Sequence, residues 1–386
     1  MAEDAIPDSL RAHLALALIP GLGPKLTAAL LEQFGSPEAA LKAKREQLES
    51  IPKIGTKLAT QFAKSFGTVS IDAEWALIRK HRVDVSLITE ADYPAPLRGI
   101  PDAPALLYRR GAFAEVDRNA IGIVGSRACT EYGRRTAAQL AASFARAGWT
   151  VISGLAYGID RSAHEGAIKA GGRTIAVLAG GLASIYPRDH IPLAEECVQH
   201  GAIVTETPMT VAPQPGMFPA RNRIISGLSR GIVVIEANLR SGALITATHA
   251  AEQGREVFVI PGNVDSPASA GCLDLIRKGA RLVRNADDIL EDLQGIAAPS
   301  QPLSKTKTAP PIQQQLFDEP APAPAIPTGL DEKQLAVWQK LESTKHADEL
   351  ARELSMSPGE LSVIVMKLEM KKLVRRLPGN HFERRS

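Results

Sequence analysis

Short apolar runs rich in β-branched residues recur between residues 120 and 293, and segments of helical periodicity separate them. The runs are 121–124, 150–152, 174–178, 202–205, 232–235, 257–260 and 281–283. Strands that alternate with helices form βαβ units, whose strands pair in parallel. The runs are continuously apolar, as in a sheet that is covered on both faces. This rhythm predicts an α/β fold with a Rossmann-like, doubly wound and mostly parallel sheet.

The N-terminal residues predict a separate helical module. Residues 1–68 have helical spacing and contain two similar hairpins, at 19–25 and 51–57. Glycine in each hairpin allows a tight turn before the next helix. We expect a helix-hairpin-helix or SAM-like domain over 1–68, followed by the extended core over 69–296.

The C-terminal quarter of the chain changes character twice. Residues 297–330 are rich in proline, alanine and glutamine, and such a segment is expected to be an extended linker. Residues 331–386 recover helical spacing and end in a ribbon pattern, which is the order of a winged helix-turn-helix. In that module Ser357 is a candidate N-cap, with Pro358 at the first helical position.

Composition restricts the cellular setting. The 386 residues suggest two or three domains, and a net charge of +3 does not by itself identify a polyanionic partner. Cys129, Cys197 and Cys272 are scattered, which argues against a disulfide framework and a zinc site. No run approaches the ~20 apolar residues that span a bilayer, and the N-terminus lacks the basic start of a signal peptide. We expect a cytoplasmic protein without a membrane partner.

Glycine-bearing loops follow three successive strands of the predicted sheet. They are Gly125-Ser126-Arg127, Ser153-Gly154 and Gly180-Gly181. The first is not a G-x-G-x-x-G turn, so no dinucleotide cofactor is expected. The Gly125 and Ser126 amides and the Arg127 guanidinium suit a phosphate instead. The alternative is a tight structural turn with a solvated Arg127.

An aromatic residue lies close to several arginines further along the chain. The cluster comprises Phe218, Arg221, Asn222 and Arg223, and Arg240-Ser241 follows the next strand. A ring beside phosphate ligands can stack on the bases of a single strand. Alternatively, Phe218 packs in the core, and either Arg221 or Arg223 is structural, paired with Glu206 or Glu236.

Catalytic and metal-binding patterns are weak. Asp160 and His164 are four residues apart, but two ligands make a poor metal site, and a capping Asp160 is the simpler interpretation. Glu206 and Glu236 end strands, where a hydrolase of glycosidic bonds could use a carboxylate. No nucleophile-elbow, zincin or Walker A motif is present. We expect no catalytic residue, metal or cofactor.

The C-terminal residues form a basic stretch that could contact phosphates or dock a protein. Its cations are Lys367, Lys371, Lys372, Arg375, Arg376, Arg384 and Arg385.

The order of the motifs resembles the family of DNA-processing protein A (DprA, also called Smf). The resemblance rests on Gly125-Ser126-Arg127, Ser153-Gly154, Gly158-Ile159-Asp160, His164, Tyr186-Pro187, Phe218 with Arg221-Asn222-Arg223, Ser241-Gly242 and Pro261-Gly262. It covers the core, and both terminal modules look like those of longer members.

The resemblance implies a dimeric bacterial protein that catalyses no known reaction. Members bind single-stranded DNA and load the recombinase RecA on it, displacing single-strand-binding protein, during natural transformation. By this resemblance Arg127 would hold a phosphate and Phe218 would line a base-accepting pocket. Further phosphate contacts would come from Arg221, Arg223 and Arg240.

The rival interpretation is a nucleotide-processing hydrolase. Phosphoribohydrolases of the same Rossmann-like superfamily carry a P-G-G-x-G-T-x-x-E loop. The nearest segment here, Pro261-Gly262-Asn263, lacks the second glycine and the glutamate.

Overall fold

The computed structural model describes residues 6–66, 68–294, 330–341, 345–354, 356–371, 373–377 and 381–384. The chain divides into two compact units, Met1–Leu303 and Ser304–Ser386, which are described separately. Apart from its last residue, the expected linker 297–330 lies outside the described residues. No helix within the described ranges is long and apolar enough to cross a membrane.

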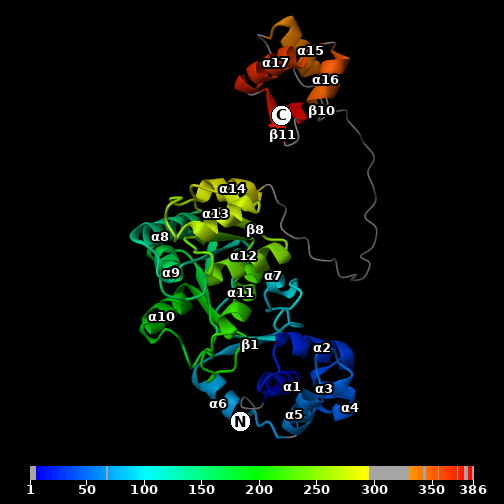
Figure 1. Cartoon of the computed structure of the whole chain (residues 1–386), viewed down its shortest axis with the longest axis vertical. Coiled ribbons are helices and arrows are strands. Elements are labelled where there is room, and N and C mark those ends of the chain that lie inside the picture. Colours follow the sequence, from blue (N-terminus) through cyan, green and yellow to red (C-terminus); the bar gives the residue numbers. More distant parts are fainter. Residues whose placement is uncertain are drawn as a thin grey trace, which may run out of the picture. The chain divides into compact units, whose positions relative to one another are not determined.

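A nine-stranded sheet forms the centre of the first unit (Figure 1), in the order β1-β2-β6-β5-β4-β3-β7-β8-β9. All pairs from β6 to β9 are parallel, whereas β2 pairs antiparallel with β1 and β6. The strands are β1 (Asp84–Leu87), β2 (Leu106–Gly111), β3 (Ala120–Gly125), β4 (Thr150–Ser153), β5 (Thr174–Val177), β6 (Gly201–Thr205), β7 (Gly231–Ile235), β8 (Glu256–Val259) and β9 (Arg281–Leu282). The predicted doubly wound, mostly parallel sheet is confirmed.

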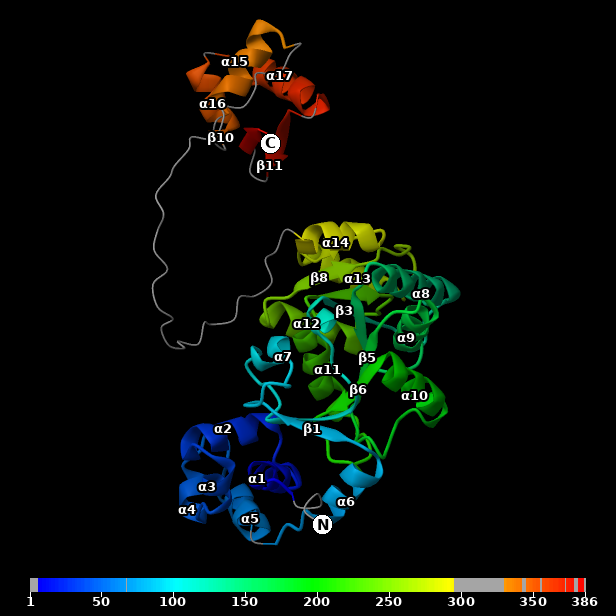
Figure 2. The same cartoon turned by 180° about the vertical axis from the view of Figure 1, so that it is seen from behind.

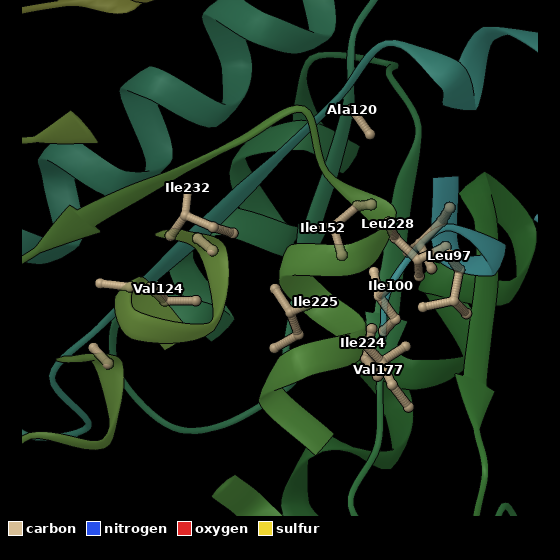
Figure 3. Close-up of a cluster of buried hydrophobic side chains, with 14 of the residues drawn as sticks. Leu97, Ile100, Ala120, Val124, Ile152, Val177, Ile224, Ile225, Leu228 and Ile232 are labelled. Atoms are coloured by element: carbon tan, nitrogen blue, oxygen red, sulfur yellow. The ribbon is translucent and has the colours of Figure 1, made fainter. Parts of the chain in front are cut away.

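Helices cover both faces of this sheet. On one face Ile121 and Ile123 of β3 pack against α8 (Glu131–Arg146), α9 (Ile159–Lys169) and α14 (Ala286–Gln294). On the other face Ala120 and Val124 pack against α7 (Ala95–Arg98), α11 (Met217–Leu228), α12 (Gly242–Glu252) and α13 (Ala270–Arg277). Figure 3 shows this second cluster, in which Ile224, Ile225 and Leu228 of α11 meet strand residues. Successive residues of one strand therefore serve opposite layers.

The N-terminal helices pack on the same unit. They are α1 (Asp8–Ala17), α2 (Pro24–Phe34), α3 (Pro37–Leu41), α4 (Arg45–Glu49), α5 (Thr56–Phe66) and α6 (Asp72–Lys80). The two hairpin turns bury Ile19 and Ile51 in a small core of their own. Leu10 and Leu14 of α1 instead join a cluster that reaches the sheet and α10 (Ile191–His200). Figure 2 shows α1 and α2 beside the part of the unit that contains β1.

The second unit is a small winged helix. Its elements are α15 (Glu332–Lys340), β10 (Lys345–His346), α16 (Ala347–Glu353), α17 (Pro358–Met370), β11 (Val374–Leu377) and β12 (His381–Arg384). Ser357 caps α17 by accepting from the amide of Glu360, with Pro358 in the first turn, as predicted. Trp338 and Phe382 close its hydrophobic core.

Candidate nucleic-acid interface

The site begins where the strand order reverses. β3 pairs with β4 on one side and β7 on the other, so the chain winds away from β3 in both directions. Open α/β sheets bind ligands in the crevice at such a switch point, beyond the carboxyl ends of the strands. A cavity of about 630 Å³ lies there, here called the switch-point cavity. Its lining includes Gly125, Ser126, Arg127, Ala156, Asp160, Phe218, Arg221, Asn222, Asn238, Arg240, Ser241 and Thr246.

Arg127 and Phe218 lie next to each other in the lining of this cavity. The Arg127 side chain is exposed, and its Cζ lies 4.7 Å from the centroid of the half-buried Phe218 ring. Tyr186, which is 51% exposed, meets the same ring edge-on at 6.2 Å. A cation and two aromatic rings are therefore presented together, as in proteins that stack single-stranded bases.

Close packing fixes the loop that carries Arg127. A Cβ added to Gly125 would lie 1.9 Å from the carbonyl oxygen of Ile235, so only glycine fits at this position. The Ser126 amide donates to the Glu236 carbonyl at 2.7 Å. This amide is consequently not available to a phosphate, and that part of the sequence interpretation is wrong. The Ser126 hydroxyl accepts from the amide of Ala128 at 3.2 Å.

The first turn of α11 positions Phe218. Pro219 is tolerated next to it because the first amides of a helix have no intrahelical acceptor. On the other side of the cavity Ser241 caps α12, accepting from the amide of Ala243 at 3.3 Å. Arg240 precedes this cap and is exposed. The side-chain amide of Asn222 donates to the backbone carbonyl of Gly242 at 3.3 Å and so links α11 to α12.

Arg221 lies beneath the cavity as a buried cation. It is 5% exposed and donates to the carbonyl of Gly154 at 2.7 Å and to the carbonyl of Val177. Burial lowers the pKa of Arg221 to about 10, although the Asp160 carboxylate opposes this shift, so the guanidinium stays charged at neutral pH. Burial likewise raises the pKa of Asp160, against the effect of Arg221. Because the two charges are opposite, they largely balance each other and add little net charge under the site.

Arg223 does not reach the cavity. It is 2% exposed, with its Nε 3.2 Å from Asp102 and an Nη 2.6 Å from Glu206. The expectation that one arginine is structural is confirmed, and that arginine is Arg223. The assignment of Arg223 as a phosphate contact is corrected, because its guanidinium is ion-paired with two carboxylates. Glu236 has another role, accepting from the amide of Thr130 at 2.7 Å at the start of α8.

The remaining glycine loops support the site from below or lie elsewhere. Ser153 is buried and donates to the carbonyl of Ile123 at 2.7 Å. Gly154 is buried against the Arg221 guanidinium. Gly180 and Gly181 pack against residues 208–213 and do not line the switch-point cavity. The first loop lines the cavity and the second, 153–160, contributes Ala156 and Asp160, whereas the third loop does not line it.

Asp160 and His164 have structural roles. Asp160 accepts from the amides of Gly154 and Ala156 at 3.2 and 3.4 Å. The Nδ1 of His164 lies 2.7 Å from the Thr174 hydroxyl, and burial lowers the pKa of this histidine to about 3. Within the described ranges, no three His, Cys, Asp or Glu side chains gather as a metal site.

Sequence reasoning missed Asn238 and Thr246. Both line the cavity, and Asn238 accepts from the amide of Arg240 at 2.9 Å through its side chain. Their position along the chain was the available signal, since Asn238 lies three residues after β7 and Thr246 lies in the second turn of α12.

Several cations of the C-terminal basic stretch are engaged within the winged helix. Arg384 lies with its Cζ 3.9 Å from the centroid of the Trp338 ring, and Arg375 pairs with Glu383. Lys371 donates to the side chain of Gln334 at 2.9 Å. Lys372, Arg385 and the side chain of Arg376 lie outside the described residues.

Comparisons with known proteins agree with this architecture. The family described as DNA recombination-mediator protein A matches residues 84–294. A DprA winged helix domain matches 319–380, and a SAM-like helix-hairpin-helix tandem matches 14–67.

Similar proteins extend over most of the chain. Protein Smf of Synechocystis is 33% identical over 395 residues, covering 96% of this chain and 98% of the relative. The DNA processing protein DprA of Bacillus subtilis is 43% identical over 219 residues, covering 56% of this chain and 74% of the relative.

Two solved structures show the same fold. DNA processing protein A of Streptococcus pneumoniae superposes with a TM-score of 0.64 at 32% identity, covering 74% of this chain and 98% of that one. A Helicobacter pylori relative, whose structure is described as showing a single-stranded DNA binding mode, superposes with a TM-score of 0.50 at 28% identity. The match covers 55% of this chain and 96% of that one. The chain therefore belongs to the DNA recombination-mediator protein A family.

Proposed function

We propose that this chain binds single-stranded DNA in the switch-point cavity. The observation that carries the proposal is the exposed Arg127 guanidinium, 4.7 Å from the centroid of the half-buried Phe218 ring. The description of the Helicobacter pylori relative as a single-stranded DNA binder supports it.

The exposure of each side chain indicates its role in binding. Arg127 and Arg240 are exposed and can each meet a phosphate, whereas Arg221 is buried and its charge is largely balanced by Asp160. Phe218 and Tyr186 offer ring faces and edges to bases. Because every base has a π-face, such a platform binds unpaired strands with little sequence preference. A paired duplex keeps its bases stacked inside and cannot use the rings.

Bound strands serve recombination in this family. The chain acts in the cytoplasm as a homodimer that loads RecA on single-stranded DNA and displaces single-strand-binding protein. The helical domain 1–68, the core 69–296, the linker 297–330 and the winged helix 331–386 divide these tasks, with strand binding in the core.

The protein carries out this role without catalysis. A hydrolase acting in the switch-point cavity would need a carboxylate there, but neither Glu206, paired with Arg223, nor Glu236, bound at the start of α8, lines that cavity. Both groups already have structural partners, which favours a binding protein over a nucleotide-processing hydrolase.

The test is a titration of matched single- and double-stranded oligonucleotides by fluorescence anisotropy across a salt series. We expect tighter binding of the single strand at every salt concentration, with affinity falling as salt rises because counterions are released. Equal affinities for the two forms would refute the proposal, since phosphates alone would then account for binding.

A further inference from the structure

A second cavity of about 640 Å³ opens at the same edge of the sheet, here called the hairpin cleft. One wall comprises the carboxyl ends of β5 and β6, with Leu178 and Glu206. The opposite wall is the first N-terminal hairpin, from Leu16 to Pro24, with Thr27 of α2. The cleft therefore joins the helical domain to the edge of the sheet where the proposed DNA site lies.

The two cavities share a wall, which is the first turn of α11. Phe218 and Asn222 line the switch-point cavity, Met217 and Ala220 line the hairpin cleft, and Arg221 lines both. A helix with its side chains is about 10–12 Å across, so a short length of chain spans the separation. A strand that leaves the ring of Phe218 across this turn enters the cleft.

A buried donor marks the shared wall. The Nε of Arg221 is buried and has no hydrogen-bond partner within the part of the chain that the structure describes. Buried polar groups nearly always have a partner, so the shared wall carries a donor that the described residues leave unsatisfied.

The chemistry of the hairpin cleft differs from that of the first site. Aliphatic side chains dominate its lining, among them Leu18, Leu22 and Val211. Its lining also includes the half-buried carboxylate of Glu206, whose Oε2 accepts from Arg223 while no described residue donates to Oε1. A carboxylate repels phosphate. It accepts instead from the exocyclic amine of a base such as cytosine.

We propose that the hairpin cleft is a second subsite for the same strand, which receives an unpaired, amine-bearing base after the strand passes Phe218. The inference rests on the proposed function, and it gives the N-terminal hairpin a role in holding the strand. Apolar walls pack the faces of the base, and Glu206 accepts from its amine.

The test fills the cleft without adding a ring that could stack. Thr27→Leu places an aliphatic side chain on the hairpin wall at a half-buried position, and Ala220→Leu places one on the wall formed by α11 at an exposed position. Thr248→Leu with Ala142→Leu is the matched control, because these positions line neither cavity. Oligo-dC and oligo-dT of about 4 to about 16 nucleotides serve as ligands, a range that covers typical strand-binding sites.

We expect wild type and control to gain about fivefold or more in affinity from the shortest to the longest oligo-dC, as one further packed base provides. The cleft-filled variant should bind the shortest oligonucleotide as tightly as wild type does. Its affinity should not rise with the length of the oligonucleotide. The gain should be smaller with oligo-dT, which offers a carbonyl in place of the amine.

A cleft-filled variant that keeps the full gain would overturn the proposal. An equal gain in affinity with oligo-dT would also overturn it. So would a cleft-filled variant that already binds the shortest oligonucleotide more weakly than wild type. Failure of the underlying function is distinguishable, because wild type would then bind neither ligand at any length.

Discussion

Arg223→Ala should destabilise the core severely without removing a DNA contact. The side chain is 2% exposed and ties Asp102 to Glu206 with separations of 3.2 and 2.6 Å. Removing one partner of a buried ion pair typically costs about 3–5 kcal/mol, because the other charge remains buried and unpaired. For a unit that spans Met1–Leu303 each kcal/mol lowers the thermal midpoint by about 1.5–2 °C, so the expected drop is about 5–10 °C.

The loss of stability in Arg223→Ala should depend on pH in a defined direction. Burial raises the pKa of Glu206, and the Arg223 guanidinium opposes that rise. Without the arginine, the folded-state pKa rises further above its unfolded value. The native state then binds more protons than the unfolded chain, so its stability increases as pH falls. The difference between variant and wild type should therefore shrink from pH ~8 to pH ~5.

Calorimetry and DNA binding together decide the role of Arg223. Arg127→Ala is the matched control, since an exposed arginine should change stability by less than about 0.5 kcal/mol. Below its melting temperature, Arg223→Ala should keep the wild-type salt dependence of DNA affinity. If Arg223→Ala melts like wild type and its DNA affinity depends less steeply on salt, by about one phosphate contact, this account is refuted.

Three further predictions concern the loop, the domains and catalysis. Gly125→Ala should lower the thermal midpoint and weaken DNA binding, because its Cβ would lie 1.9 Å from the Ile235 carbonyl oxygen; an equally stable variant would contradict that packing argument. Residues 1–296 alone should retain most single-strand affinity by anisotropy, whereas a collapse of binding in a truncated protein still folded by circular dichroism would place the main site in the tail. Incubation with nucleoside monophosphates should give no products by chromatography, and steady turnover abolished by Glu206→Gln would show that the protein is an enzyme.

The architecture was predictable because its signals are local. The central parallel strands, such as β3 and β7, are continuous apolar runs, and such runs identify buried strands wherever they pair. β2 was missed because Arg109 and Arg110 interrupt its pattern and prolines precede it. Its place between β1 and β6 depends on pairing with distant segments.

The site was only partly predictable because long-range contacts decide which side chains reach a ligand. Spacing along α11 shows that Arg221 and Arg223 differ in direction, but Arg223 becomes structural through Asp102 and Glu206 on other segments. The Ser126 amide is likewise occupied by a carbonyl beyond β7. The sequence indicates which residues can bind a phosphate, and tertiary packing selects among them.

The most direct test of the central claim compares Arg127→Ala and Phe218→Ala in single-strand binding across a salt series. Each phosphate contact contributes about −0.7 to the slope of log affinity against log salt for single strands. Arg127→Ala should therefore weaken binding and flatten the slope by about one contact. Phe218→Ala should cost about 1–3 kcal/mol and leave the slope nearly unchanged, because stacking releases few ions. If both variants bind like wild type at every salt concentration, the DNA site is not in the switch-point cavity.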